Sequence, residues 1–166
     1  PRELTRPVMV GSVQIGGGAP VVVQSMTCTP TSDTEATLNQ IRALADGGCD
    51  VVRVTLPNRA AIDSFKAICD ASPVPIIADI HFDYRLAIAA IDAGAAKLRI
   101  NPGNIGSWEK VDAVIDAAGA AGAAIRIGVN AGSLEEDLAS RDDLTQPEKL
   151  VASSLRFVEH FEARGF

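Results

Sequence analysis

The sequence predicts an α/β protein, and specifically part of a (β/α) barrel of the TIM type with a short β-hairpin in front. Short apolar runs rich in Val and Ile, typical of strands buried on both faces, begin near residues 20, 50, 74, 96 and 123. Helical patterns separate these runs, so a strand–helix unit recurs roughly every 22–30 residues. Right-handed crossovers then leave a doubly wound sheet or a barrel. No Gly-x-Gly-x-x-Gly follows the first strand, which disfavours a dinucleotide-binding sheet.

The first elements follow from local patterns. Residues 6–17 alternate apolar and polar side chains around Gly11, which predicts a hairpin within segment 1–19 that would plug one end of the barrel. The run 20–26 predicts the first strand. The capping-box pattern Ser32-x-x-Glu35 then predicts a helix that ends at Gly47-Gly48.

Four further units complete segment 20–166. Strands are predicted over 50–56, 74–82, 96–101 and 123–130. Helices are predicted after a cap at Asn58, up to Gly94, from Ser107, and from Thr145-x-x-Glu148 to near Gly165. A tight turn is expected at Pro102-Gly103, and an acidic, polar loop over 133–146. A closed barrel needs eight units and about 250 residues, so the sequence predicts about five units of a larger barrel.

Charge and composition argue against several classes of function. The net charge of −6 argues against a general nucleic-acid surface. No apolar run reaches the roughly 18 residues of a membrane span, and the start lacks a secretory signal, so a cytoplasmic location is expected. Cys28, Cys49 and Cys69 are widely spaced, which predicts neither a disulfide framework nor a metal site.

Three predicted strands each place an arginine between aliphatic residues. Strand alternation puts Arg53, Arg99 and Arg126 on one face, near the carboxyl ends of their strands, where barrel enzymes build their active sites. A single strand arginine often pairs with a carboxylate or reaches solvent. Three arginines in equivalent registers are harder to explain in this way, because Asp79 could neutralise only one of them. The pattern predicts a shared site for a phosphate or diphosphate.

Polar residues at the same rim extend this prediction. Asp79 and His81 share a face of the third strand and could transfer or orient a proton, although a core histidine bound to backbone is the plainer alternative. Asn101 and Asn130 could hydrogen-bond a ligand, or could serve only as turn formers. Trp108 is interpreted as a packing residue.

At these residues the sequence resembles a known family. The motifs QSMT (24–27), ADIHFDYRLA (78–87), LRINPGNIG (98–106) and RIGVNAGSLE (126–135) are similar to those of the 4-hydroxy-3-methylbut-2-enyl diphosphate synthases of the methylerythritol phosphate route to isoprenoids. The resemblance covers residues 7–166 in order. Four long motifs are far more specific than one short pattern.

The resemblance implies an oxidoreductase with a substrate-binding barrel and a C-terminal domain that holds a [4Fe-4S] cluster. Flavodoxin or ferredoxin would supply two electrons, and 2-C-methyl-D-erythritol 2,4-cyclodiphosphate would undergo ring opening and dehydration. The full-length enzyme would be a homodimer. By motif, Arg53, Arg99 and Arg126 would hold the cyclodiphosphate. Asn101 and Asn130 would assist them, and Asp79 and His81 would be catalytic.

The sequence departs from this family in three respects. It contains neither the cluster domain, whose ligands would be three cysteines and a glutamate, nor the sixth strand with a further lysine. Cys28 stands where Asn is expected, and no residue here is expected to bind metal. The 166-residue chain alone is therefore predicted to be inactive. The alternatives are a barrel enzyme for a phosphorylated or pterin substrate, similar to dihydropteroate synthase, or a non-catalytic phosphate-binding or assembly module.

Overall fold

A parallel five-stranded sheet forms the centre of the molecule. The computed structural model describes residues 4–166, so the first three residues of the predicted segment 1–19 lie outside the described part. The strand order is β3-β4-β5-β6-β7, which is also the order along the chain. The strands are β3 (Gln24–Met26), β4 (Val51–Thr55), β5 (Ile76–Ile80), β6 (Lys97–Ile100) and β7 (Ala124–Ile127).

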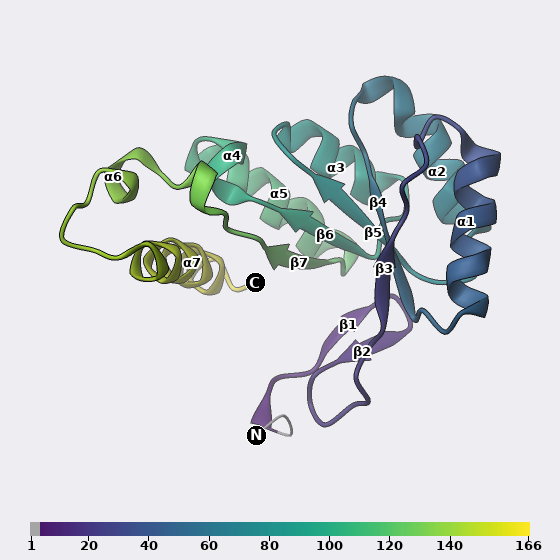
Figure 1. Ribbon diagram of the computed structural model, residues 1–166, viewed down its shortest axis with the longest axis horizontal. Helices are drawn as coiled ribbons and strands as arrows, with labels where there is room; N and C mark the ends of the chain where they lie inside the picture. The colour runs from purple at the N-terminus through teal and green to yellow at the C-terminus, as the bar shows by residue number, and fades with distance from the viewer. Residues whose placement is uncertain (1–3) are drawn as a thin grey trace.

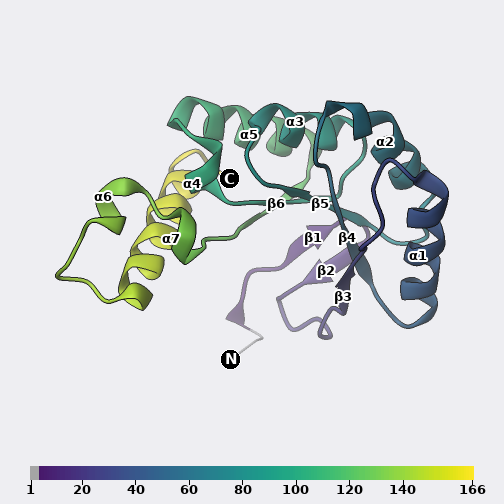
Figure 2. The same cartoon turned by 45° about the horizontal axis from the view of Figure 1, so that its top comes forward.

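Helices connect the strands and cover one face of the sheet, where α1, α2, α3 and α5 lie side by side (Figure 1 and Figure 2). The helices are α1 (Thr34–Asp46), α2 (Ile62–Ala71), α3 (Tyr84–Asp92), α4 (Pro102–Ile105), α5 (Trp108–Ala121), α6 (Glu136–Ala139) and α7 (Gln146–Ala163), with short 3-10 turns at Arg59–Ala61 and Ala131–Ser133. This arrangement confirms the predicted strand–helix repeat and the α/β fold class.

The main core lies between the sheet and these helices. Every second strand residue faces it, including Val54, Ala78 and Leu98, and all three are completely buried. Phe65 and Ile68 of α2 pack against them from the helical side. Since these positions bury the aliphatic side of each strand, the intervening positions face the other side of the sheet.

The hairpin covers the opposite face, beneath the sheet in Figure 2. Strands β1 (Val8–Val10) and β2 (Val13–Ile15) pair antiparallel around Gly11, as predicted. Val10 is fully buried in a second apolar cluster with Val51, Ile77 and Ala124, which lie in the first half of their strands. The hairpin therefore closes the amino-terminal end of this face and leaves the carboxyl ends of the strands open.

Several element boundaries differ from those predicted. The first strand is limited to β3, because residues before Gln24 do not pair as a regular ladder. Helix α1 begins after Asp33, not Ser32, because the Asp33 carboxylate accepts the Ala36 N–H at 3.0 Å. The predicted turn at Pro102 is the short helix α4, whose first residue is that proline. The polar loop contains the short helix α6.

Helix α7 docks on α5 through aromatic and ionic contacts. The Trp108 ring lies 5.1 Å from Phe157 and 4.2 Å from His160, measured between centroids. His160 Nε2 lies 2.6 Å from Asp112 Oδ1, and Arg164 reaches the same carboxylate. Trp108 is thus the packing residue that the sequence indicated. Among the described residues, no helix is long and apolar enough to cross a membrane.

Candidate anion-binding site

Charged side chains occupy the sheet face opposite the helices, at two levels. The upper level consists of Thr55, Asp79, Arg99 and Arg126, which are paired across neighbouring strands. The lower level, two residues nearer the strand beginnings, consists of Met26, Arg53, Ile77, Lys97 and Ala124. The predicted equivalence of the three arginines is therefore wrong for Arg53. Its register follows from the pairing of β4 with β5, which strand composition does not reveal.

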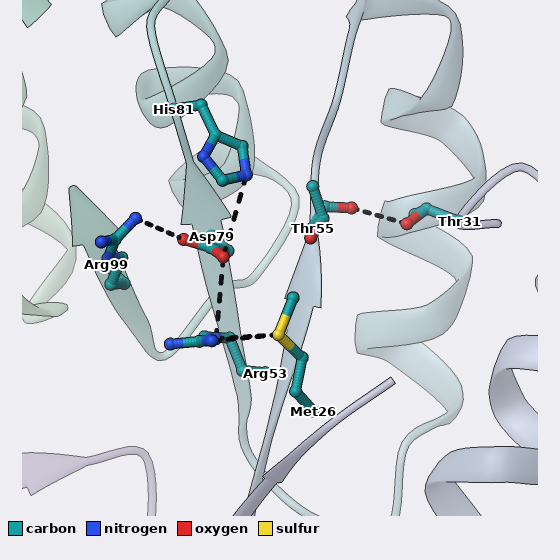
Figure 3. A network of polar contacts seen from close by, with 7 residues as sticks. All are labelled: Met26, Thr31, Arg53, Thr55, Asp79, His81 and Arg99. Carbon is teal, nitrogen blue, oxygen red and sulfur yellow. Dashed lines mark hydrogen bonds and ion pairs between the residues drawn. The ribbon is translucent and has the colours of Figure 1, made fainter. Parts of the chain in front are cut away.

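Asp79 joins two of the arginines. Its side chain is almost completely buried, and its Oδ1 accepts a hydrogen bond from Arg99 Nη1 at 3.3 Å (Figure 3). Its other oxygen, Oδ2, lies 3.7 Å from Arg53 Nε. Its two oxygens face different levels, but its one negative charge can balance only one of the two guanidiniums. A buried carboxylate held this way fixes both guanidiniums in place.

The sulfur of Met26 holds Arg53 from the other side. Arg53 donates from Nε and Nη2 to Met26 Sδ, at 3.3 and 3.0 Å (Figure 3). Thioether sulfur is a weak acceptor, so this contact orients the guanidinium without neutralising it. The loop after β3 is tied to β4 by the Thr31 hydroxyl, which donates to the Thr55 carbonyl oxygen at 2.5 Å.

His81 lies just beyond the end of β5 and faces Asp79. Its Nε2 is 3.9 Å from Asp79 Oδ2, and 46% of its side chain is exposed. Its ring contacts Phe82, with 6.2 Å between the centroids. The plainer alternative of a buried core histidine does not apply, because this imidazole can exchange protons with solvent while it contacts a buried carboxylate.

Arg126 stands apart from the Asp79 network. It is exposed on β7, an edge strand of the described sheet. Within residues 4–166 it has no hydrogen-bond or ion-pair partner, although its register places it opposite Arg99. Its guanidinium is therefore available to a ligand at the upper level.

Asn101 and Asn130 are linked through a residue that the sequence argument did not single out. Asn101 is buried, and its Nδ2 donates to the Ser133 hydroxyl at 2.5 Å. The Ser133 backbone N–H donates to the carbonyl oxygen of Asn130 at 3.1 Å. Asn130 is exposed, with its side chain at the rim. In this structure Asn101 thus positions the loop that presents Asn130.

Gly128 is the second residue that sequence reasoning missed. A Cβ atom at this position would lie 2.8 Å from Arg99 Nε and 3.1 Å from Nη2. The absence of a side chain therefore makes room for the guanidinium. The available signal was its position two residues after Arg126, on the same strand face.

The cysteines do not form a metal site. Within the described residues, no group of three His, Cys, Asp or Glu side chains is placed to hold a metal ion. Cys28 is exposed, whereas Cys49 and Cys69 pack partly buried against the helical core. Burial, followed by the charge of Asp70, raises the pKa of Cys69 to about 12, so this thiol is not the thiolate that a cluster requires. The residues of this chain do not fit an iron–sulfur cluster.

Comparison with known proteins identifies the family. The model of the GcpE TIM-barrel domain matches residues 5–166. This chain belongs to the GcpE TIM-barrel domain family. The domain is 49% identical to the 4-hydroxy-3-methylbut-2-en-1-yl diphosphate synthase (flavodoxin) of Marinomonas sp. (strain MWYL1), over 99% of this chain and 45% of that protein.

Two other relatives match with similar identity and coverage. The proteins of the same description from Natranaerobius thermophilus and Lawsonia intracellularis are 51% and 52% identical over 99% of the GcpE-type chain, and each match covers 46% of the relative. The chain thus spans less than half the length of these curated relatives. The family resemblance and the barrel-type fold predicted from the sequence are confirmed.

Solved structures show the same fold at low identity. A dihydropteroate synthase from Yersinia pestis superposes with a TM-score of 0.61 at 12% identity, covering 95% of this chain and 56% of that chain. One from Vibrio fischeri gives a TM-score of 0.53 at 12% identity, over 73% and 48% of the two chains. At this identity the likeness establishes the barrel architecture of the GcpE-type chain and carries no substrate with it.

Proposed function

We propose that this chain is the substrate-binding barrel portion of a 4-hydroxy-3-methylbut-2-enyl diphosphate synthase and binds 2-C-methyl-D-erythritol 2,4-cyclodiphosphate at the carboxyl ends of its strands. The observation that carries the proposal is the excess of positive charge there. Arg53 and Arg99 contact one buried carboxylate, Asp79, and Arg126 lies opposite Arg99 without an acidic partner among the described residues. Such a site favours an anion with more than one negative charge.

The charge arrangement suits the proposed chemistry. When the cyclic diphosphate opens, the oxygen that leaves carbon gains negative charge. Guanidiniums already held in place by Asp79 and Met26 stabilise that charge without reorganising. The loop tied by Asn101 brings Asn130 to the rim, where its amide can contact a substrate hydroxyl. His81, exposed and beside Asp79, supplies or accepts a proton at the same rim.

The remaining components lie beyond the residues of this chain in the proposal. In the complete cytoplasmic enzyme, a further domain would hold a [4Fe-4S] cluster that would supply two electrons, with flavodoxin or ferredoxin as their source. The hydroxyl of the substrate leaves as water, and two chains assemble as a homodimer. We expect the 166-residue chain by itself to give no turnover with a reductant, because the electrons come from the further domain in this proposal.

Replacing Arg99 tests the proposal. Binding of the cyclodiphosphate and its reductive turnover are measured in the protein at its natural length, for the wild type, Arg99→Met and Arg42→Met. Arg42 is the matched control, since it is exposed on α1 and contacts only Asn39. We expect Arg99→Met to weaken binding by about tenfold or more, and Arg42→Met to match the wild type.

Two results would contradict the proposal. One is a wild-type protein that does not bind the cyclodiphosphate. If that protein binds a pterin instead, the result favours a dihydropteroate synthase-like enzyme. The other is an Arg99→Met protein that binds the cyclodiphosphate as tightly as the Arg42→Met control does.

A further inference from the structure

A fourth cation faces the arginines. Lys97 is the first residue of β6, paired with Ile77 on one side and Ala124 on the other. It lies at the lower level with Arg53, on the sheet face opposite Leu98, which packs in the helical core. This lysine opens the strand, whereas Arg99 stands in its middle.

The surroundings of Lys97 are poor for an ammonium. The side chain is half-buried, and its strand neighbours Ile77 and Ala124 are buried aliphatic residues. Among residues 4–166 no carboxylate, carbonyl or hydroxyl forms an ion pair or hydrogen bond with it. Asp79, the acidic group on this face, is engaged by Arg53 and Arg99. A half-buried charge without a counterion lowers the stability of the free protein. Residues that carry such a cost are typical of binding sites.

The strand register puts Lys97 on the same sheet face as Arg53 and Arg126. Lys97 shares the level of Arg53, and Arg126 follows its β7 partner Ala124 by two residues. Burial lowers the pKa of Lys97, and the positive charges of Arg126 and then Arg53 lower it further. An anion bound among them would replace this repulsion with attraction.

We propose that Lys97 is a binding residue of the anion site, where its charge at the lower level lets the site prefer a diphosphate over a single phosphate. The inference rests on the proposed function and extends it to a residue and a selectivity. Cations at two levels, about 6–7 Å apart along the strands, suit two linked phosphoryl groups. Arg99 and Arg126 serve one phosphoryl group, and Arg53 and Lys97 serve the other.

Calorimetric titration with inorganic pyrophosphate and with inorganic phosphate tests this selectivity in the protein at its natural length. The variants are Lys97→Met, Lys97→Arg and the control Lys66→Met, which removes an exposed lysine paired with Asp70 on α2. We expect Lys97→Met to weaken pyrophosphate about tenfold and phosphate by about twofold at most. Lys97→Arg and Lys66→Met should retain the wild-type preference.

Chemical protection provides a measurement that needs no variant. Acetic anhydride acylates neutral amines, and the lowered pKa of Lys97 favours its neutral form. Saturating pyrophosphate should slow acylation of Lys97 severalfold, while Lys66, distant on α2, reacts at an unchanged rate in the same sample.

The outcomes separate this inference from the proposed function. If pyrophosphate binding depends on Arg99, but Lys97→Met behaves like Lys66→Met, the anion site stands and Lys97 is only a strand residue. Equal losses for pyrophosphate and phosphate, or unprotected acylation, also overturn the role in selectivity. If the wild type binds neither pyrophosphate nor the cyclodiphosphate, the proposed function itself fails.

Discussion

At the residue scale, the candidate site depends on one buried carboxylate and on the space around one arginine. Strand alternation was sufficient to place Arg99 and Asp79 on a common face, and their contact follows from the pairing of β5 with β6. It could not place Arg53, because its level depends on how β4 pairs with β5. Nor could it identify Gly128, which lacks a side chain and so leaves room for the Arg99 guanidinium.

Replacing Gly128 with Ala should displace Arg99 and weaken the anion site. The new methyl group would lie 2.8 Å from Arg99 Nε, so the guanidinium must shift from the position in which it contacts Asp79. We expect pyrophosphate affinity to fall severalfold, with a change in the free energy of unfolding of less than about 1 kcal/mol, because only a flexible side chain shifts. Calorimetric titration and urea unfolding measure the two effects. Affinity equal to the wild type would show that the room at Gly128 is not needed.

Cys28 and Cys69 should differ in reactivity, because Cys28 is exposed and burial favours the protonated thiol of Cys69. The pKa of Cys69 rises from 9.0 to about 12, so its thiol stays protonated in the folded protein at pH 9. Iodoacetamide at that pH should label the exposed Cys28 far faster than Cys69, as quantified by peptide mass spectrometry. Equal rates would contradict the burial argument.

The same shift predicts a loss of stability in alkali. The folded protein holds the Cys69 proton more tightly than the unfolded chain does, so the contribution is fully present below pH 9. It is lost as the pH rises from 9 towards 12, and the free energy of unfolding should fall over this interval. Urea unfolding of the wild type and of Cys69→Ala measures the difference. A parallel pH dependence in the two proteins would assign the alkaline loss to other groups.

At the scale of elements, the sequence predicted which segments are strands and helices better than where they end. Helix stops near Gly47 and Gly94 were readable because both glycines follow an amphipathic run. The predicted strands were too long, because their sequence patterns extend beyond the residues that pair with a neighbouring strand. The strand predicted over 74–82, for example, ends at Ile80. The choice between Ser32 and Asp33 as cap depends on loop geometry that composition does not encode.

Helix α7 depends on its capping box. Glu148 Oε2 accepts the Thr145 backbone N–H at 2.7 Å and the Thr145 hydroxyl at 2.6 Å. Thr145→Ala should lower the free energy of unfolding by about 1 kcal/mol and increase amide exchange in the first turn of α7. Ser140→Ala, in the preceding exposed loop, is the control. Unchanged exchange at the start of α7 would show that docking on α5 alone maintains the helix.

At the scale of the whole molecule, the strand–helix repeat determined the architecture before any single boundary was certain. Five buried strands joined by helices permitted few topologies, and the observed order β3 to β7 is the barrel-type solution. The hairpin was predictable from the alternation around Gly11. Its docking was only a hypothesis, because it depends on apolar residues from four separate segments.

The hairpin should contribute measurably to stability through Val10. Val10→Ala removes two methyl groups from a fully buried position, and we expect a loss of about 2 kcal/mol in urea unfolding. Met9→Ala is the matched control on the same strand, since Met9 is 49% exposed. Equal effects for the two substitutions would mean that the hairpin packs loosely on the sheet.

The position of the hairpin also orders the folding process. Val10 shares an apolar cluster with Ala124, roughly 110 residues further along the chain, so this cluster cannot be completed until β7 has been synthesised and paired. During translation Val10 stays exposed while each strand–helix unit forms from local contacts. Docking of the hairpin is therefore a late event, and burial of Val10 reports that the sheet which carries the arginines has formed.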